Sequence, residues 1–187
     1  MAGIEAGAGA ERPLRGMLLA NAPNGWLQTL AFLVSGGLGL AWAAGMGRVL
    51  GVTGAERRLV WRLLALQSIL ALLFAVVPTD PGARATSLVG VLHLANFGVY
   101  AVSMPVTLLL IARIMARDPR WVGWASPTRG AGVVALVSMA LVPLTLYGRL
   151  LPWLGLLERI YVAIPTVWEA AVLMAALRRI SGASGKR

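Results

Sequence analysis

Residues 87–111 read SLVGVLHLANFGVYAVSMPVTLLLI, a run of 25 residues without Lys, Arg, Asp or Glu. About 20 consecutive apolar residues are enough for a helix to cross the hydrocarbon core of a bilayer. Four further apolar stretches of similar length occur, so that the five expected spans are Gly25–Met46, Leu59–Val77, Ser87–Ile111, Gly130–Tyr147 and Tyr161–Leu177. The sequence therefore predicts an all-α, polytopic transmembrane bundle of about five helices.

The composition agrees with a membrane protein. Hydrophobic residues make up 58% of the 187 residues and charged residues only 13%, against about 25% charged residues in a typical soluble domain. The formal charge is +10, but the basic residues lie in the connections between apolar segments and not in a patch with interleaved aromatics. This placement argues against nucleic acid as a partner. The chain has no cysteine, and nothing in it predicts a metal site or a cofactor.

The distribution of Lys and Arg predicts the orientation. The stretches that follow the first, third and fifth segments hold four Lys or Arg each, whereas the opposite side holds five in all. Cytoplasmic loops carry the excess of basic residues in membrane proteins. We therefore expect the N-terminus outside, the C-terminus in the cytoplasm, and the cytoplasmic membrane as the location.

The ends and connections of the chain give further expectations. Residues 1–22 are expected to be a mobile tail, 23–180 the bundle, and 181–187 a basic tail. The connection Asp118–Pro127 contains Trp121, Trp124 and Arg120, which is typical of a segment at the membrane surface. Leu150–Leu157 is apolar but carries Pro and Gly. We expect it to lie along the outer interface, outside the fifth helix.

The third segment carries a polar stripe. Its members are spaced by three and four residues, which places them on one face of a helix: His93, Asn96, Tyr100, Ser103 and Thr107. Polar groups that face lipid are unfavourable, so this face is expected to point into the bundle or a cavity. His93 is the only histidine. It is either a hydrogen-bonded interhelical residue or a group that transfers protons or contacts a ligand.

The fifth segment places a carboxylate deep in the membrane. Glu158, Tyr161, Pro165 and Glu169 share one helical face. At a rise of about 1.5 Å per residue, Glu169 lies roughly 16 Å below Glu158, near the midplane. An ionised carboxylate there is unfavourable unless it is paired. The simplest structural expectation is a protonated Glu169 that is hydrogen-bonded to a neighbouring helix, and the alternative is a proton or substrate pathway.

Three motifs together resemble a known family. They are residues 24–28 (NGWLQ) leading into 32–38 (FLVSGGL), the break at 77–81 (VPTDP) before the helix with His93, and residues 155–160 (GLLERI). In order and spacing they resemble the bacterial and archaeal membrane proteins of domain-of-unknown-function family 998. That family typically has six helices, one of them before the Gly-Trp motif, so the resemblance implies that this first helix is lacking here. The matching positions are Asp80, His93, Glu158 and Arg159.

These four residues are expected at one depth near the outer surface, because each follows or begins a membrane segment. We predict that Asp80, His93, Glu158 and Arg159 form one outward polar cluster. The leading functional hypothesis is a non-enzymatic protein that binds a lipid or small hydrophobic ligand, or a subunit of a membrane assembly. One alternative is a small enzyme that uses His93 with Asp80 or Glu158 as acid and base on a lipid-like substrate. Another is a transporter or proton-conducting component that uses the polar stripe and Glu169. Membrane lipids are the expected partners, with a homo-oligomer or a larger complex as further expectations.

Overall fold

A computed structural model describes residues 25–80, 85–147 and 151–184. These ranges contain five α-helices and no extended β-strand: α1 (Gly25–Val49), α2 (Gly54–Val76), α3 (Leu88–Met115), α4 (Val122–Tyr147) and α5 (Leu151–Ser184). Each contains a stretch long and apolar enough to cross a membrane. The predicted five-helix transmembrane class is thereby confirmed. The two predicted tails lie outside the described residues, apart from the last helical turn at 181–184.

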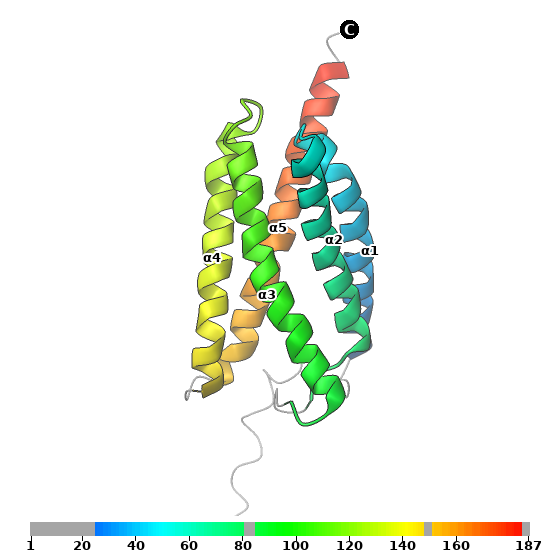
Figure 1. Ribbon diagram of the computed structural model, residues 1–187, viewed down its shortest axis with the longest axis vertical. Coiled ribbons are helices and arrows are strands. Elements are labelled where there is room, and N and C mark those ends of the chain that lie inside the picture. The colour runs from blue at the N-terminus through cyan, green and yellow to red at the C-terminus, as the bar shows by residue number, and fades with distance from the viewer. Residues whose placement is uncertain (1–24, 81–84, 148–150, 185–187) are drawn as a thin grey trace, which may run out of the picture.

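The helices form two antiparallel pairs and a fifth helix that runs obliquely from one pair toward the other (Figure 1). α1 packs along α2, and α4 packs along α3. α3 begins near the end of α2 and ends beside α4, whereas α5 begins beside α4 and ends near the α1–α2 turn. One end of the bundle holds this turn, the α3–α4 connection and the C-terminal part of α5. We call it the basic end, because it carries Arg48, Arg57, Arg58, Arg113, Arg117, Arg120, Arg178 and Arg179.

Small residues allow α1 and α2 to approach closely. α1 turns into α2 through Gly51 and Gly54, whose φ angles of 68° and 56° lie in the left-handed region that glycine tolerates best. Along the contact, a Cβ atom on Gly36 would lie 2.6 Å from Leu72 Cγ and 2.9 Å from the Ser68 carbonyl oxygen. The two backbones are therefore in contact at Gly36, in the manner of small-residue interfaces between membrane helices.

Gly36→Val should destabilise the bundle by about 1–3 kcal/mol, because the new side chain would overlap α2 and force the helices apart. Gly37→Val is the matched control, since a Cβ there meets no atom within 4 Å. Thermal unfolding in one detergent would compare the two variants. Equal melting temperatures for Gly36→Val and Gly37→Val would contradict this close packing.

Two connections are shorter than the sequence predicts. α4 begins at Val122, so most of the expected surface segment Asp118–Pro127 is helical. α5 begins at Leu151, so the expectation that Leu150–Leu157 lies outside the fifth helix is wrong. The physical reason is that Pro152 occupies the first helical turn, where a backbone N–H has no intrahelical partner and its absence does no harm.

Trp121 is buried against other parts of the protein, which was not predicted from the sequence. Its side chain is only 2% exposed, and its Nε1–H donates to the Val49 carbonyl oxygen at 3.1 Å. The Arg179 guanidinium lies 3.8 Å from the ring centroid, close enough for a cation–π interaction. Arg179 also donates to the Arg120 carbonyl oxygen. Trp121 therefore joins the end of α1, the α3–α4 connection and α5 at the basic end.

Candidate intramembrane binding site

The polar stripe of α3 lies inside the bundle, as the unfavourable energy of polar groups in lipid predicts. His93, Asn96, Ser103 and Thr107 are buried. His93 Nδ1 lies 2.7 Å from the Val77 carbonyl oxygen, and because a carbonyl only accepts, Nδ1 carries the hydrogen. Asn96 Nδ2 donates to the Leu70 carbonyl oxygen at 3.0 Å. These residues of the stripe thus attach α3 to the backbone of α2.

Gln67 completes this attachment from the other side. Its Nε2 donates to Thr107 Oγ1 at 2.6 Å and to the Ser103 carbonyl oxygen at 3.3 Å. Thr107 Oγ1 in turn donates to the Ser103 carbonyl oxygen at 2.7 Å. Interhelical hydrogen bonds of this kind contribute about 0.6 kcal/mol each on average in membrane proteins. This part of the stripe therefore contributes to packing between α2 and α3, and its groups are engaged with protein atoms.

The predicted outward cluster is described only in part. Asp80 and His93 both lie at the start of α3, and each has its own partner. Asp80 accepts from the backbone N–H of Thr86 and of Ser87, both at 2.7 Å, and from the Ser87 hydroxyl at 2.7 Å. Arg159 is exposed, and the Glu158 side chain lies outside the described residues. The convergence of Asp80, His93, Glu158 and Arg159 therefore stays a prediction.

Asp80 caps the N-terminus of α3 together with Ser87, whose hydroxyl accepts from the Gly90 N–H at 3.0 Å. Hydrogen bonds from Ser87, and then from Thr86, lower the pKa of Asp80 from 3.8 to about 2. The capping carboxylate lies against the Gly90 backbone, at a place where a Cβ atom would overlap it. Gly90 is therefore required for this cap.

Asp80→Asn should lower the melting temperature at pH 7 by a few degrees, because the amide accepts hydrogen bonds from the helix N-terminus less strongly than a carboxylate does. A lowered pKa contributes stability above pH 3.8, and this contribution is lost as the pH falls through about 2. The gap between wild type and Asp80→Asn should thus close on acidification, as measured by thermal unfolding. A gap that is independent of pH would contradict the cap.

Gly90→Ala should be destabilised like Asp80→Asn, whereas Gly98→Ala, where a Cβ meets nothing within 4 Å, should not.

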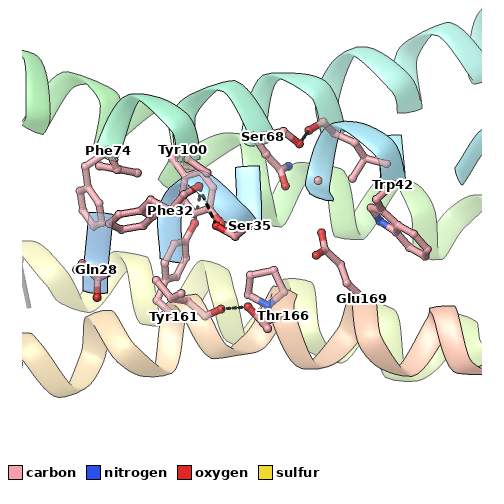
Figure 2. Close-up of a pocket in the computed structure, with 17 residues that line it drawn as sticks. Gln28, Phe32, Ser35, Trp42, Ser68, Phe74, Tyr100, Tyr161, Thr166 and Glu169 are labelled. Carbon is pink, nitrogen blue, oxygen red and sulfur yellow. Dashed lines mark hydrogen bonds between the residues drawn. The ribbon is translucent and has the colours of Figure 1, made fainter. Parts of the chain in front are cut away.

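A pocket of about 140 Å³ lies between α1, α2, α3 and α5 (Figure 2). One side of it is aromatic. Ring contacts connect the four helices in series, from Phe32 to Phe74 at 5.3 Å between centroids, Phe74 to Tyr100 at 6.0 Å, and Tyr100 to Tyr161 at 6.0 Å. Phe97 and Trp42 add to this lining. Tyr100 is therefore the one member of the polar stripe that lines the pocket.

Two polar groups of the lining matter most here, and neither of them makes a hydrogen bond with a described residue. The first is the carboxylate of Glu169, which is directed from α5 into the pocket (Figure 2). It makes no hydrogen bond or ion pair with any described residue, so the expected bond to a neighbouring helix is not observed. The second is Trp42 Nε1, which is buried and unpaired within the described part of the chain. Buried polar groups are nearly always hydrogen-bonded in proteins, so Trp42 Nε1 leaves room for an acceptor from a ligand, and the half-buried carboxylate of Glu169 is free to contact the same ligand.

The contrast with Trp168 makes the unpaired Trp42 informative. The two rings are in edge-to-face contact at 6.5 Å. Trp168 Nε1 donates to Thr128 Oγ1 at 2.9 Å, as buried tryptophans usually do. Trp42 on α1 has no such acceptor among the residues that the structure describes. Trp42 therefore differs from an ordinary packing tryptophan of this bundle.

The pocket opens between α1 and α5. Its exposed lining residues come from these two helices, Ser35 from α1 and Thr166 from α5. α1 packs on α2 and α5 on α4, so no continuous helix contact closes this side. Pro165 also lies here, and because it lacks an N–H it leaves the carbonyl of Tyr161, four residues before it, without its helical hydrogen bond. The mouth of the pocket thus lies between the stretches of α1 and α5 that are long and apolar enough to span a membrane.

The described residues include no group of His, Asp or Glu with the spacing of a metal site. The sequence alone identifies Tyr100, Tyr161, Pro165 and Glu169, but not the residues of α1 and α2 that complete the pocket. Gln67 could have been found, because it is an isolated amide within an apolar segment. Trp42 could not, because a tryptophan inside a spanning segment is typical of ordinary packing.

The fold, the spans and the pocket are those of an integral membrane protein with several crossings. No curated protein and no solved structure matches the chain. A family model described as a protein of unknown function (DUF998) matches residues 14–175, which contain α1 to α4 and most of α5. The chain therefore belongs to the DUF998 family.

Proposed function

We propose that this protein binds an amphiphile from the membrane in the pocket between α1, α2, α3 and α5. The observation that carries the proposal is the pairing of an aromatic lining with two unpartnered polar groups, Glu169 and Trp42 Nε1. The polar head of an amphiphile would pair with these two groups, and its apolar part would contact the aromatic rings. Its head would accept a hydrogen bond from Trp42, and its tail would leave through the mouth beside Ser35 and Thr166.

The size of the pocket supports a compact head group. A cavity of about 150 Å³ in a protein interior is enough to hold a benzene ring, and this pocket has about 140 Å³. A head group of a few heavy atoms would fill it. A longer alkyl chain would have to run along the lipid-facing surface between α1 and α5.

A photoreactive amphiphile tests this function. The protein would be placed in phosphatidylglycerol nanodiscs with a 12-carbon alcohol that carries a diazirine, irradiated, and digested for mass spectrometry. We expect labelling to concentrate on pocket residues of α1 and α5. Ala71→Trp should abolish it, because Ala71 lines the pocket and the indole would fill it.

Ile69→Trp is the matched control. Ile69 lies on the same helix but is 47% exposed and faces lipid, so the same indole is added without filling the pocket. Labelling of the pocket peptides should survive in this variant. Labelling spread evenly over lipid-facing residues, with no difference between the two variants, would contradict the proposal.

We propose further that the basic end faces the cytoplasm, following the distribution of Arg and Lys. Because the chain has no native cysteine, a thiol reagent can react only with the cysteine that is introduced. Ala85→Cys, at the opposite end, should react with an impermeant thiol reagent added to intact cells. Ala116→Cys, at the basic end, should react only after permeabilisation. The reverse result would invert the orientation without affecting the pocket.

A further inference from the structure

The described residues that line the pocket include an acidic group but no basic one. Glu169 is the only acidic residue among the described residues that line the pocket, and none of these residues is Lys, Arg or His. A carboxylate inside a membrane is normally paired with a cation or with hydrogen-bond donors. No described side chain supplies such a partner. The electrostatic complement of this pocket is therefore a positive charge brought by the ligand.

The aromatic lining points to the same charge. Six aromatic side chains surround the pocket, and they are Phe32, Trp42, Phe74, Phe97, Tyr100 and Tyr161. The face of an aromatic ring attracts cations through its quadrupole, most strongly when the cation is desolvated. A carboxylate combined with several rings is a favourable surrounding for an alkylammonium group, whose charge lies among C–H groups. An anionic head group would instead meet the like charge of Glu169.

Trp42 adds a second requirement. Its buried Nε1–H needs an acceptor, and an ammonium group cannot accept. A head group that carries an oxygen close to its nitrogen would satisfy both residues at once, with the ammonium at Glu169 and the oxygen at Trp42. The shared chemistry of the ligand is then that of an amino alcohol with an alkyl tail.

We infer that the amphiphile bound in this pocket is cationic, an alkylammonium with a neighbouring hydroxyl, held by the carboxylate of Glu169 and by Trp42 Nε1. This inference rests on the proposed function. It names the charge and the head group of the ligand. It assigns Glu169 as the residue that determines specificity.

Competition with a pair of matched compounds tests the inference. N-dodecylethanolamine is cationic, whereas N-dodecanoylethanolamine has the same hydroxyethyl group and the same number of chain carbons but is an uncharged amide. Each would be titrated against the photoreactive alcohol in the same nanodiscs. In the wild type we expect the amine to displace the probe at a concentration about tenfold lower than the amide, because charge-assisted hydrogen bonds are stronger than neutral ones.

Three variants separate the contribution of Glu169 to binding from that of Trp42. In Glu169→Gln the advantage of the amine should fall to within about threefold, while the neutral probe still labels the pocket. Glu56→Gln removes a carboxylate that is paired with Arg117 at 2.9 Å outside the pocket, so it should keep the full preference. Trp42→Phe keeps an aromatic ring but removes the donor, and it should weaken the binding of both compounds.

Each outcome has a definite meaning. If Glu169→Gln kept the full preference for the amine, the inference that Glu169 selects a cationic ligand would be wrong. The pocket would then be a site for neutral amphiphiles. If free ethanolamine displaced the photoreactive alcohol at the same concentration as N-dodecylethanolamine, the inference that the ligand carries an alkyl tail would be wrong. Absence of pocket labelling in the wild type would remove the proposed function itself, a failure that is distinguishable from the other two.

Discussion

Glu169→Lys should prevent the protein from accumulating as a folded bundle, whereas Glu169→Gln should fold like the wild type. Glu169 stands at the centre of the apolar stretch Arg159–Arg179, and no other carboxylate of a described residue lines the pocket. A lysine there would be an ammonium group without an acidic partner, at a cost of about 2.5–3.5 kcal/mol or more. Glutamine preserves the size of the side chain without a charge.

Fluorescence-detected size-exclusion chromatography of both variants would measure this difference directly. We expect a monodisperse peak for Glu169→Gln at wild-type yield and a loss of most of that peak for Glu169→Lys. A Glu169→Lys variant with wild-type yield and melting temperature would mean that position 169 is exposed to water. In that event the pocket would not be an intramembrane site.

Trp121→Ala should be the most destabilising substitution at the basic end, by about 3–5 kcal/mol, as for other fully buried aromatic side chains. The substitution removes the hydrogen bond to the Val49 carbonyl oxygen and the ring beneath Arg179. It would therefore loosen α1, the α3–α4 connection and α5 together. Trp61→Ala is the control, because Trp61 is 50% exposed and its loss should change the unfolding free energy by less than about 0.5 kcal/mol.

Thermal unfolding in a single detergent would compare the two tryptophan variants. The comparison rests on the ordering of the two variants, because both are measured in the same detergent. Similar losses for Trp121→Ala and Trp61→Ala would show that Trp121 belongs to the ordinary aromatic belt at the membrane surface.

The spans were predictable because each depends only on local composition. An apolar run of sufficient length must be helical in lipid, where every backbone polar group needs an internal partner. The inward direction of His93, Asn96, Ser103 and Thr107 was predictable for a related reason, since spacing alone places them on one face. The position of Glu169 near the centre of its span follows from a count of residues.

The pocket was not predictable, because it depends on how the helices cross. Trp42, Ser68 and Glu169 come together only through the oblique course of α5 and its contact with α1, and no spacing within one helix encodes this. The burial of Trp121 depends equally on the carbonyl of Val49, 72 residues earlier. The start of α5 was mistaken because Pro152 was taken as a helix breaker, although proline is well tolerated in a first turn.

The most direct test of an amphiphile-binding pocket is native mass spectrometry of the protein extracted with its surrounding lipid, without detergent exchange. We predict about one amphiphile retained per chain in the wild type and in Ile69→Trp, and its loss in Ala71→Trp, where the pocket is filled. The same retained molecules in equal amounts in wild type and Ala71→Trp, or none in the wild type, would contradict the account.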